Sequence, residues 1–455
     1  MRPDRRVLLT FIIVVFLGGL FLNLPPVSSR VANLLENARV RVRAMIFPQN
    51  EVAFLPGGEV LPTITPLVET IVPGPTLDRA PSATPAPTLT QTVTLITPRS
   101  TPTATPTPTP LPATMALRGV RWETQNGAWN YCGPTNLSML LSYWGWKGDK
   151  FTTGKYLKPF DYDLNVMPYE MQNFVQEKTT DLGMEVRYGT SLALVKKLIA
   201  NGFPVLIETG VYFPETATGV EGWMGHYRVL TGYNDDRKEI IAQDSYLKAD
   251  LAISYDGFDQ NWRAFNFVIG VAYSKDKHDQ LFALLGDYAD PTASATIALK
   301  TATDEMWKLS GIDQYYAWYN RGSSLVALQD YIGAAEAYDK AFELYAKLPE
   351  DRRPWRMIWH QTGPYFAYFY AGRYQDVADL ATNTLDTITN RAERLGIADR
   401  PQVGPFIEET WVWRARVRLV LGDQQGAVDD LKTALKYHPG FPAAIDELKK
   451  LGINP

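Results

Sequence analysis

The chain contains one cysteine, Cys132, within the segment QNGAWNYCGPTNLSMLLSYWGW. The residues that follow predict a helix beginning at this cysteine, because Pro134 is tolerated in a first helical turn. Unpaired N–H groups and the positive end of the helix dipole favour a thiolate there, and a thiolate attacks carbonyl carbon. We therefore interpret Cys132 as a nucleophile; the alternative is a small buried hydrophobic residue. The inward face of the helix would carry Leu137, Leu140, Leu141 and Trp144.

Histidine is scarce, so a base for this cysteine has few candidates: His226, His278, His360 and His438. The segment GHYRVLTGYNDDRKEIIAQDSY predicts two strands, 226–233 and 239–244, joined by a turn near Asp235. That turn pairs residues whose numbers sum to about 470, which brings Asp244 opposite His226. The carboxylate could accept the Nδ1 proton while the other nitrogen takes the thiol proton. The alternative is a structural histidine and a turn aspartate. The other three histidines lie at the domain edge or in helical segments.

Acyl transfer also needs hydrogen-bond donors directed at the oxyanion of the tetrahedral intermediate. The backbone N–H of Cys132 supplies one donor. A side-chain amide shortly before it can supply the other, and we assign this role to Gln125, with Asn126 and Asn130 as alternatives. A solvated polar residue without a role in the chemistry is the remaining interpretation of Gln125.

Residues 115–275 must position these groups, and their alternation of apolar strand-like runs with amphipathic helices predicts an α+β domain. In SLALVKKLIANGFPVLIETG, one helix ends near Gly202 and a buried strand follows from Pro204 to Glu208. The core-facing side of that helix would carry Leu194, Val195, Leu198 and Ile199.

Residues 290–455 show aromatic and alanine positions at helical spacing, which predicts an all-α domain of tetratricopeptide-like repeats. The two clearer units lie within 317–344 and 411–440, and a degenerate one lies within 364–386. Such an array can offer a peptide-binding groove or can be a rigid extension packed against the preceding domain, and the sequence leaves both open. The marker positions are Trp318, Gly322, Ala334, Tyr338, Ala341, Gly372, Tyr374, Val377, Trp411, Ala415, Ala427, Leu431, Ala434 and Pro439.

The N-terminal part divides into three segments. Residues 1–28 hold the uncharged run VLLTFIIVVFLGGLFLNL, which predicts a transmembrane helix, with a cleaved signal as the alternative. Residues 29–60 are juxtamembrane, and residues 61–114 form a Pro/Thr-rich linker that could span on the order of 150 Å at ~3.1 Å per residue. We expect the folded domains to be extracytoplasmic at the cell envelope; a cytoplasmic linker is the alternative.

Composition excludes several classes of function. A formal net charge of −4 over 455 residues leaves no basic footprint for nucleic acid. A single cysteine excludes an internal disulfide framework and a multi-cysteine metal site, and no metal or organic cofactor is indicated.

The motifs resemble those of papain-like cysteine peptidases related to the bacteriocin-processing, double-glycine leader peptidases, in their stand-alone bacterial branch. The resemblance rests on WNYCGPTNLSMLLSYWGW, GHYRVLTGYNDD and IIAQDSY, and it covers about Met115 to Tyr273, with Phe258 and Trp262 in the closing segment. It implies a papain-like α+β fold. The implied triad and oxyanion donor are Cys132, His226, Asp244 and Gln125. Gln125 stands seven residues before Cys132, whereas the family more often leaves five or six.

We expect a membrane-anchored extracytoplasmic cysteine peptidase that hydrolyses peptide bonds, with helical repeats that recruit a protein substrate or partner. Two alternatives from other classes remain. One is a non-catalytic peptidase-like scaffold that binds proteins. The other is an acyltransferase or transpeptidase that uses the same triad with an amine as acceptor.

Overall fold

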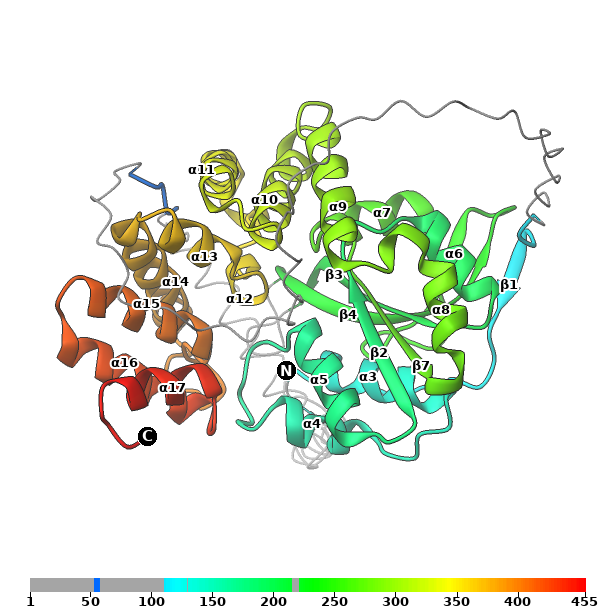
Figure 1. Cartoon of the computed structure of the whole chain (residues 1–455), viewed down its shortest axis with the longest axis horizontal. Helices are drawn as coiled ribbons and strands as arrows, with labels where there is room; N and C mark the ends of the chain where they lie inside the picture. Colours follow the sequence, from blue (N-terminus) through cyan, green and yellow to red (C-terminus); the bar gives the residue numbers. More distant parts are fainter. Residues whose placement is uncertain (1–52, 58–109, 129, 215–220) are drawn as a thin grey trace, which may run out of the picture. The chain divides into compact units, whose positions relative to one another are not determined.

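The computed structural model describes residues 53–57, 110–128, 130–214 and 221–455 (Figure 1). The predicted membrane anchor or signal, 1–28, lies outside the described residues, as do most of the juxtamembrane segment 29–60 and of the linker 61–114. Within the described part of the chain, no helix is both long enough and apolar enough to cross a bilayer.

A seven-stranded antiparallel sheet forms the centre of the segment 114–274. The strand order is β2-β7-β3-β4-β5-β6, and β1 pairs with β4. The central strand β4 carries His226 and pairs with β3 and β5. The strands are β1 Thr114–Ala116, β2 Leu182–Arg187, β3 Val205–Pro214, β4 Glu221–Asn234, β5 Glu239–Gln243, β6 Leu251–Ser254 and β7 Ile269–Ser274.

Helices cover both faces of this sheet (Figure 1). Because side chains alternate along a strand, Val205 and Ile207 of β3 face one helix layer and Leu206 faces the other. The layer packed against Leu206 consists of α3 Cys132–Tyr143, α4 Lys150–Leu157 and α5 Pro168–Lys178. The opposite layer consists of α6 Leu192–Ala200, α7 Tyr255–Arg263 and α8 His278–Leu285.

Local sequence explains α3 and α6. The N-cap Ser191 accepts a hydrogen bond from the Leu194 N–H, and α6 is followed by Gly202 at a φ of 87°. The residues predicted to face the core of α6 are all buried: Leu194, Val195, Leu198 and Ile199. In α3, Leu137, Leu140 and Leu141 are fully buried, also as predicted.

Three features of the sheet differ from the sequence prediction. Strand β4 spans Glu221–Asn234, whereas the predicted strand covers 226–233. Strand β3 continues past Glu208 to Pro214, because it pairs with β4 along its whole length. In the β4–β5 hairpin, Tyr233 pairs with Ile240. A bulge between Leu230 and Gly232 shifts the register by one residue. The pairs therefore sum to 472 or 473, and not to about 470.

The described residues after Ser274 form helices and loops. The helices are α8, α9 Pro291–Glu305, α10 Gly311–Ala327, α11 Tyr331–Lys347, α12 Met357–His360, α13 Gly363–Tyr370, α14 Tyr374–Leu395, α15 Glu408–Val420, α16 Gln424–Tyr437 and α17 Pro442–Lys450. The pairs α10/α11, α13/α14 and α15/α16 coincide with the three predicted repeat segments. Between α10 and α11, a Cβ on Gly322 would lie 2.7 Å from the Tyr338 ring, so glycine allows this close approach.

The helical region α9–α17 packs directly against the sheet domain. The Asn165 side chain donates to the Trp359 carbonyl at 2.6 Å, and the Gln361 side chain donates to the Ala264 carbonyl at 2.6 Å. One hydrophobic cluster joins Trp223 of β4 to Tyr315 of α10. The helical region is therefore fixed to the sheet domain by a shared core.

Candidate active site

A cleft of about 670 Å³ contains three of the four predicted site residues, Gln125, Cys132 and His226. The fourth, Asp244, is fully buried and contacts His226. The sequence places these residues on separate elements, and the fold brings them to one location.

Cys132 is the first residue of α3 and is half-buried in the cleft wall. The first hydrogen bond of the helix runs from the Thr135 N–H to the Tyr131 carbonyl, so the N–H of Cys132 lies outside the helical ladder. Gly133 packs closely against α5 and the segment before it, because a Cβ there would lie 3.0 Å from the Val166 Cβ and 3.1 Å from the Met171 Cε. The motif therefore places a thiol and an N–H donor at an accessible helix start.

His226 contacts Asp244 through Nε2, which lies 3.1 Å from the Asp244 Oδ1. The sequence analysis assigned Nδ1 to this contact. In the structure the two ring nitrogens have exchanged these roles, so that prediction is wrong. Because Nε2 is engaged, Nδ1 is the nitrogen left for a thiol proton. Phe213 packs edge-on to the imidazole at a centroid distance of 5.3 Å.

The Asp244 carboxylate is held by four donors. Its Oδ2 accepts from the Arg228 Nε at 2.7 Å, and its Oδ1 also accepts from the N–H groups of Tyr246 and Leu247. Burial alone would raise the pKa of Asp244, but His226, Arg228 and the Leu247 N–H outweigh burial and lower it well below its usual range. Asp244 is therefore ionised and rigid, as an orienting carboxylate must be.

The next residue, Ser245, orients Gln125. The Ser245 hydroxyl donates to the Gln125 Oε1 at 2.8 Å and accepts from the Asn136 Nδ2 at 2.9 Å. The same Asn136 amide donates to the Cys132 carbonyl at 2.9 Å. Because Oε1 is engaged, the Gln125 NH₂ group is the part left to donate into the cleft. The dipeptide Asp244-Ser245 thus holds both the histidine and the glutamine.

The alternative amide residues also line the cleft, and Asn126 and Asn130 are both exposed. The Asn130 Nδ2 donates to the Leu164 carbonyl at 3.2 Å, so one of its two N–H donors is engaged away from the cleft residues Gln125 and Cys132. Gln125 differs because its backbone N–H also donates to the Ser245 carbonyl at 2.9 Å, which fixes the whole residue.

The ionisation of Cys132 differs from the sequence expectation. Burial raises the pKa of the Cys132 thiol to about 11, and the nearby Glu208 carboxylate adds to this, although the N–H groups of Tyr227 and Gly133 act in the opposite direction. Burial also lowers the pKa of His226, against the effect of Asp244. Desolvation therefore outweighs the helix dipole, and the resting pair is a neutral thiol and a neutral imidazole.

This ionisation state predicts the pH dependence of alkylation. We expect the rate at which iodoacetamide modifies Cys132 to be low at neutral pH and to rise toward pH 11, since the raised pKa keeps the thiol protonated below that pH. Replacement His226→Ala should change this profile little, because His226 is already neutral there. The measurement is alkylation rate against pH for both proteins. A reactive thiolate that titrates below the free-cysteine pKa of about 8.5 would contradict the prediction.

The helical region supplies one wall of the same cleft, which the sequence analysis did not foresee. The contributing residues are Trp355, Arg356, Trp359, His360, Ile388, Arg391, Ala392, Leu395, Ile397, Gln402, Val403 and Gly404. Trp355 and Trp359 pack edge to face, and the Arg356 guanidinium lies over both rings. The aromatic stretch PWRMIWH between two predicted repeats was the available signal.

His360 forms a second histidine–carboxylate pair beside the cleft. Its Nδ1 lies 3.2 Å from the Oε1 of Glu208, a buried residue of β3. Burial raises the pKa of Glu208, while His360 partly offsets this rise. A Cβ on Gly225 would lie 3.0 Å from the Glu208 carboxylate, so the glycine before His226 leaves room for the pair. The pair connects α12 to the sheet next to Cys132.

A third cluster offers donor atoms for a metal ion. In the part of the chain that the structure describes, Asp163, Glu408 and His438 place one potential ligand atom each within 4.8 Å of one another. However, the His438 Nδ1 and the Glu408 Oε1 are 3.1 Å apart, and the Lys158 cation interacts with Asp163. Each of the three side chains therefore already has a partner, and we interpret the cluster as a link between the 158–163 segment and the helical region.

Comparison with known proteins identifies the matching part of the chain. Residues 117–269 match the family model described as the Peptidase_C39 like family. This segment extends from the residue after β1 to the first residue of β7 and contains Gln125, Cys132, His226 and Asp244. No curated protein matches the chain.

Proposed function

We propose that the chain is a cysteine peptidase that cleaves peptide bonds with Cys132 and His226, and the match of residues 117–269 to the Peptidase_C39 like family model supports this. Gln125 is the oxyanion donor, and Asp244 is a positioning residue. The observation that carries the proposal is the Asp244-Ser245 dipeptide, whose side chains hold His226 and Gln125 beside the cysteine cleft.

In the acylation step, the Cys132 sulfur attacks the scissile carbonyl carbon while the His226 Nδ1 takes the thiol proton. Because both groups are neutral at rest, this proton moves during the attack and not before it. The carbonyl oxygen becomes an oxyanion that accepts hydrogen bonds from the Cys132 N–H and the Gln125 Nε2. Asp244 stabilises the imidazolium through Nε2.

Collapse of the tetrahedral intermediate breaks the C–N bond, and the imidazolium returns its proton to the leaving amine. The acyl group remains on sulfur as a thioester. Water then attacks the thioester while His226 accepts the water proton, and the departing thiolate regains a proton from the imidazolium. The products are an amine and a carboxylic acid.

The helical region recruits the substrate in this proposal by forming the second cleft wall. Trp359, Ile388 and Leu395 lie among the lining residues, so the wall offers an apolar surface to an extended peptide. We propose a substrate with a large apolar side chain next to the scissile bond. The residues that form this wall also explain why the repeats follow the peptidase segment in one chain.

We further propose that the enzyme is anchored in a membrane by the apolar run within residues 1–28 and acts on the extracytoplasmic side. The support is the length and lack of charge of that run, followed by the Pro/Thr-rich linker.

The proposal is tested by incubating the full-length protein with a library of peptides derived from digested cellular proteins and identifying the products by mass spectrometry. We expect new carboxyl termini after or before large apolar residues, and none with Cys132→Ala. Products that carry an added amine at the new end would identify an acyltransferase. If the unsubstituted protein and Cys132→Ala are both folded and both leave the peptides intact, a non-catalytic scaffold would be favoured.

A further inference from the structure

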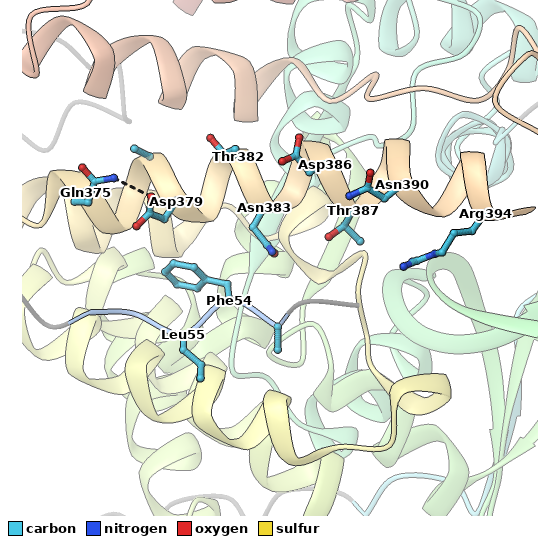
Figure 2. A pocket seen from close by; sticks show the side chains of 12 residues that line it. Phe54, Leu55, Gln375, Asp379, Thr382, Asn383, Asp386, Thr387, Asn390 and Arg394 are labelled. Atoms are coloured by element: carbon cyan, nitrogen blue, oxygen red, sulfur yellow. Dashed lines mark hydrogen bonds between the residues drawn. The ribbon is translucent and has the colours of Figure 1, made fainter. Parts of the chain in front are cut away.

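A short N-terminal segment, Ala53–Gly57, lies in a groove of the helical region, more than 280 residues away in sequence (Figure 2). Phe54 is 8 % exposed and belongs to the core cluster of the helical region, whereas Leu55 is 58 % exposed. In Figure 2 the two side chains point to opposite sides of the segment. The segment is thus seated through one aromatic side chain.

Phe54 packs against aromatic rings from two helices. Its ring meets Phe342 of α11 edge-on at a centroid distance of 5.0 Å and Tyr368 of α13 at 6.2 Å. Such aromatic pairs stabilise beyond the apolar area that they bury. The Tyr368 hydroxyl donates to Asp339 at 3.0 Å, so the ring that receives Phe54 is held in place.

A backbone contact fixes the other end of the segment. The Gly57 N–H donates to the Asp376 Oδ1 at 2.8 Å. Asp376 is buried, and its Oδ2 accepts from the Arg373 Nε at 2.7 Å. Arg373 also donates to Asp339 at 2.7 Å, and Asp339 is the residue that accepts from the Tyr368 hydroxyl. Asp376 is thereby connected to the ring that packs against Phe54. One network therefore holds both contact points.

The groove extends beyond the seated residues. Its cavity of about 570 Å³ is lined along α14 by polar side chains, and Figure 2 shows them continuing along the helix past Phe54. They include Thr382, Asn383, Asp386, Thr387 and Asn390. Amide, hydroxyl and carboxylate groups in a row can bind the N–H and C=O groups of an extended backbone.

We propose that this groove is a binding site for an extended peptide with one buried aromatic residue, and that Ala53–Gly57 is its ligand within the same chain. The docking has a structural consequence. If residues 7–24 anchor the chain, the residues before Ala53 limit the distance from the membrane to roughly 100 Å.

The test measures binding and needs no catalytic activity, so it can be run with Cys132→Ala and is independent of the proposed function. A fluorescent peptide with the sequence EVAFLPGG is titrated into the full-length protein, into Phe54→Ala and into Leu55→Ala. Attachment within the same chain gives the internal segment an effective concentration on the order of millimolar. We therefore expect Phe54→Ala to bind the peptide at least ~10-fold more tightly than the other two proteins. A peptide with alanine in place of phenylalanine should not bind.

Equal peptide binding by Phe54→Ala and the unsubstituted protein, both folded by circular dichroism, would overturn the proposal. A second measurement covers the case in which Phe54→Ala does not fold. Hydrogen exchange on the unsubstituted protein should show slower exchange in peptides that cover 53–57 than in those that cover 62–111. Equal exchange in the two segments would also overturn the proposal.

Discussion

Replacement of Asp244 by alanine is expected to lower kcat/KM by roughly 10²–10⁴-fold, since His226 loses the group that fixes its orientation and stabilises its charged form. The same change should lower the free energy of unfolding by about 3–5 kcal/mol. The reason is that Arg228, which is 4 % exposed, would keep a buried charge without its carboxylate partner. Denaturant unfolding and steady-state kinetics on a cleaved peptide measure the two effects.

Two further variants separate chemistry from stability. Asp236→Ala removes an exposed carboxylate in the β4–β5 turn and should change stability by less than about 0.5 kcal/mol. Asp244→Asn keeps an oxygen that can accept from Nε2 but removes the charge, so it should cost less stability than Asp244→Ala while still reducing kcat. Unchanged kcat/KM in both Asp244 variants would refute the positioning role.

Replacement of Gln125 by alanine is expected to lower kcat by roughly 10²–10³-fold with little change in KM, because the lost hydrogen bond forms to the oxyanion and not to the bound substrate. Ser245→Ala should reduce kcat less, since the Gln125 amide remains but loses the hydroxyl that fixes its Oε1. Steady-state kinetics on the same peptide measure both effects.

Asn126 provides the matched control for Gln125. It is the adjacent amide, it is exposed, and it lines the same cleft. Asn126→Ala should leave kcat within about twofold of the unsubstituted protein if Gln125 is the donor. A larger loss of kcat in Asn126→Ala or Asn130→Ala than in Gln125→Ala would move the oxyanion assignment to that residue.

The sequence by itself determined the local elements. The spacing of apolar residues identified α6 and its four buried positions, and the Cys-Gly-Pro turn located the start of α3. These features depend on residues within one or two turns of each other, so periodicity and capping report them directly. The proximity of Asp244 to His226 was also accessible, because a hairpin connects them over a short stretch of chain.

The tertiary structure alone decided how the site is completed. The pairing of His360 with Glu208 and the docking of Phe54 on Tyr368 join residues more than 150 positions apart, and no local pattern encodes such contacts. The direction of the Cys132 pKa shift depends in the same way on how much water the surrounding elements exclude, because desolvation opposes the helix dipole. Local spacing fixes which face of an element is buried, whereas its partner is set by the packing of the whole chain.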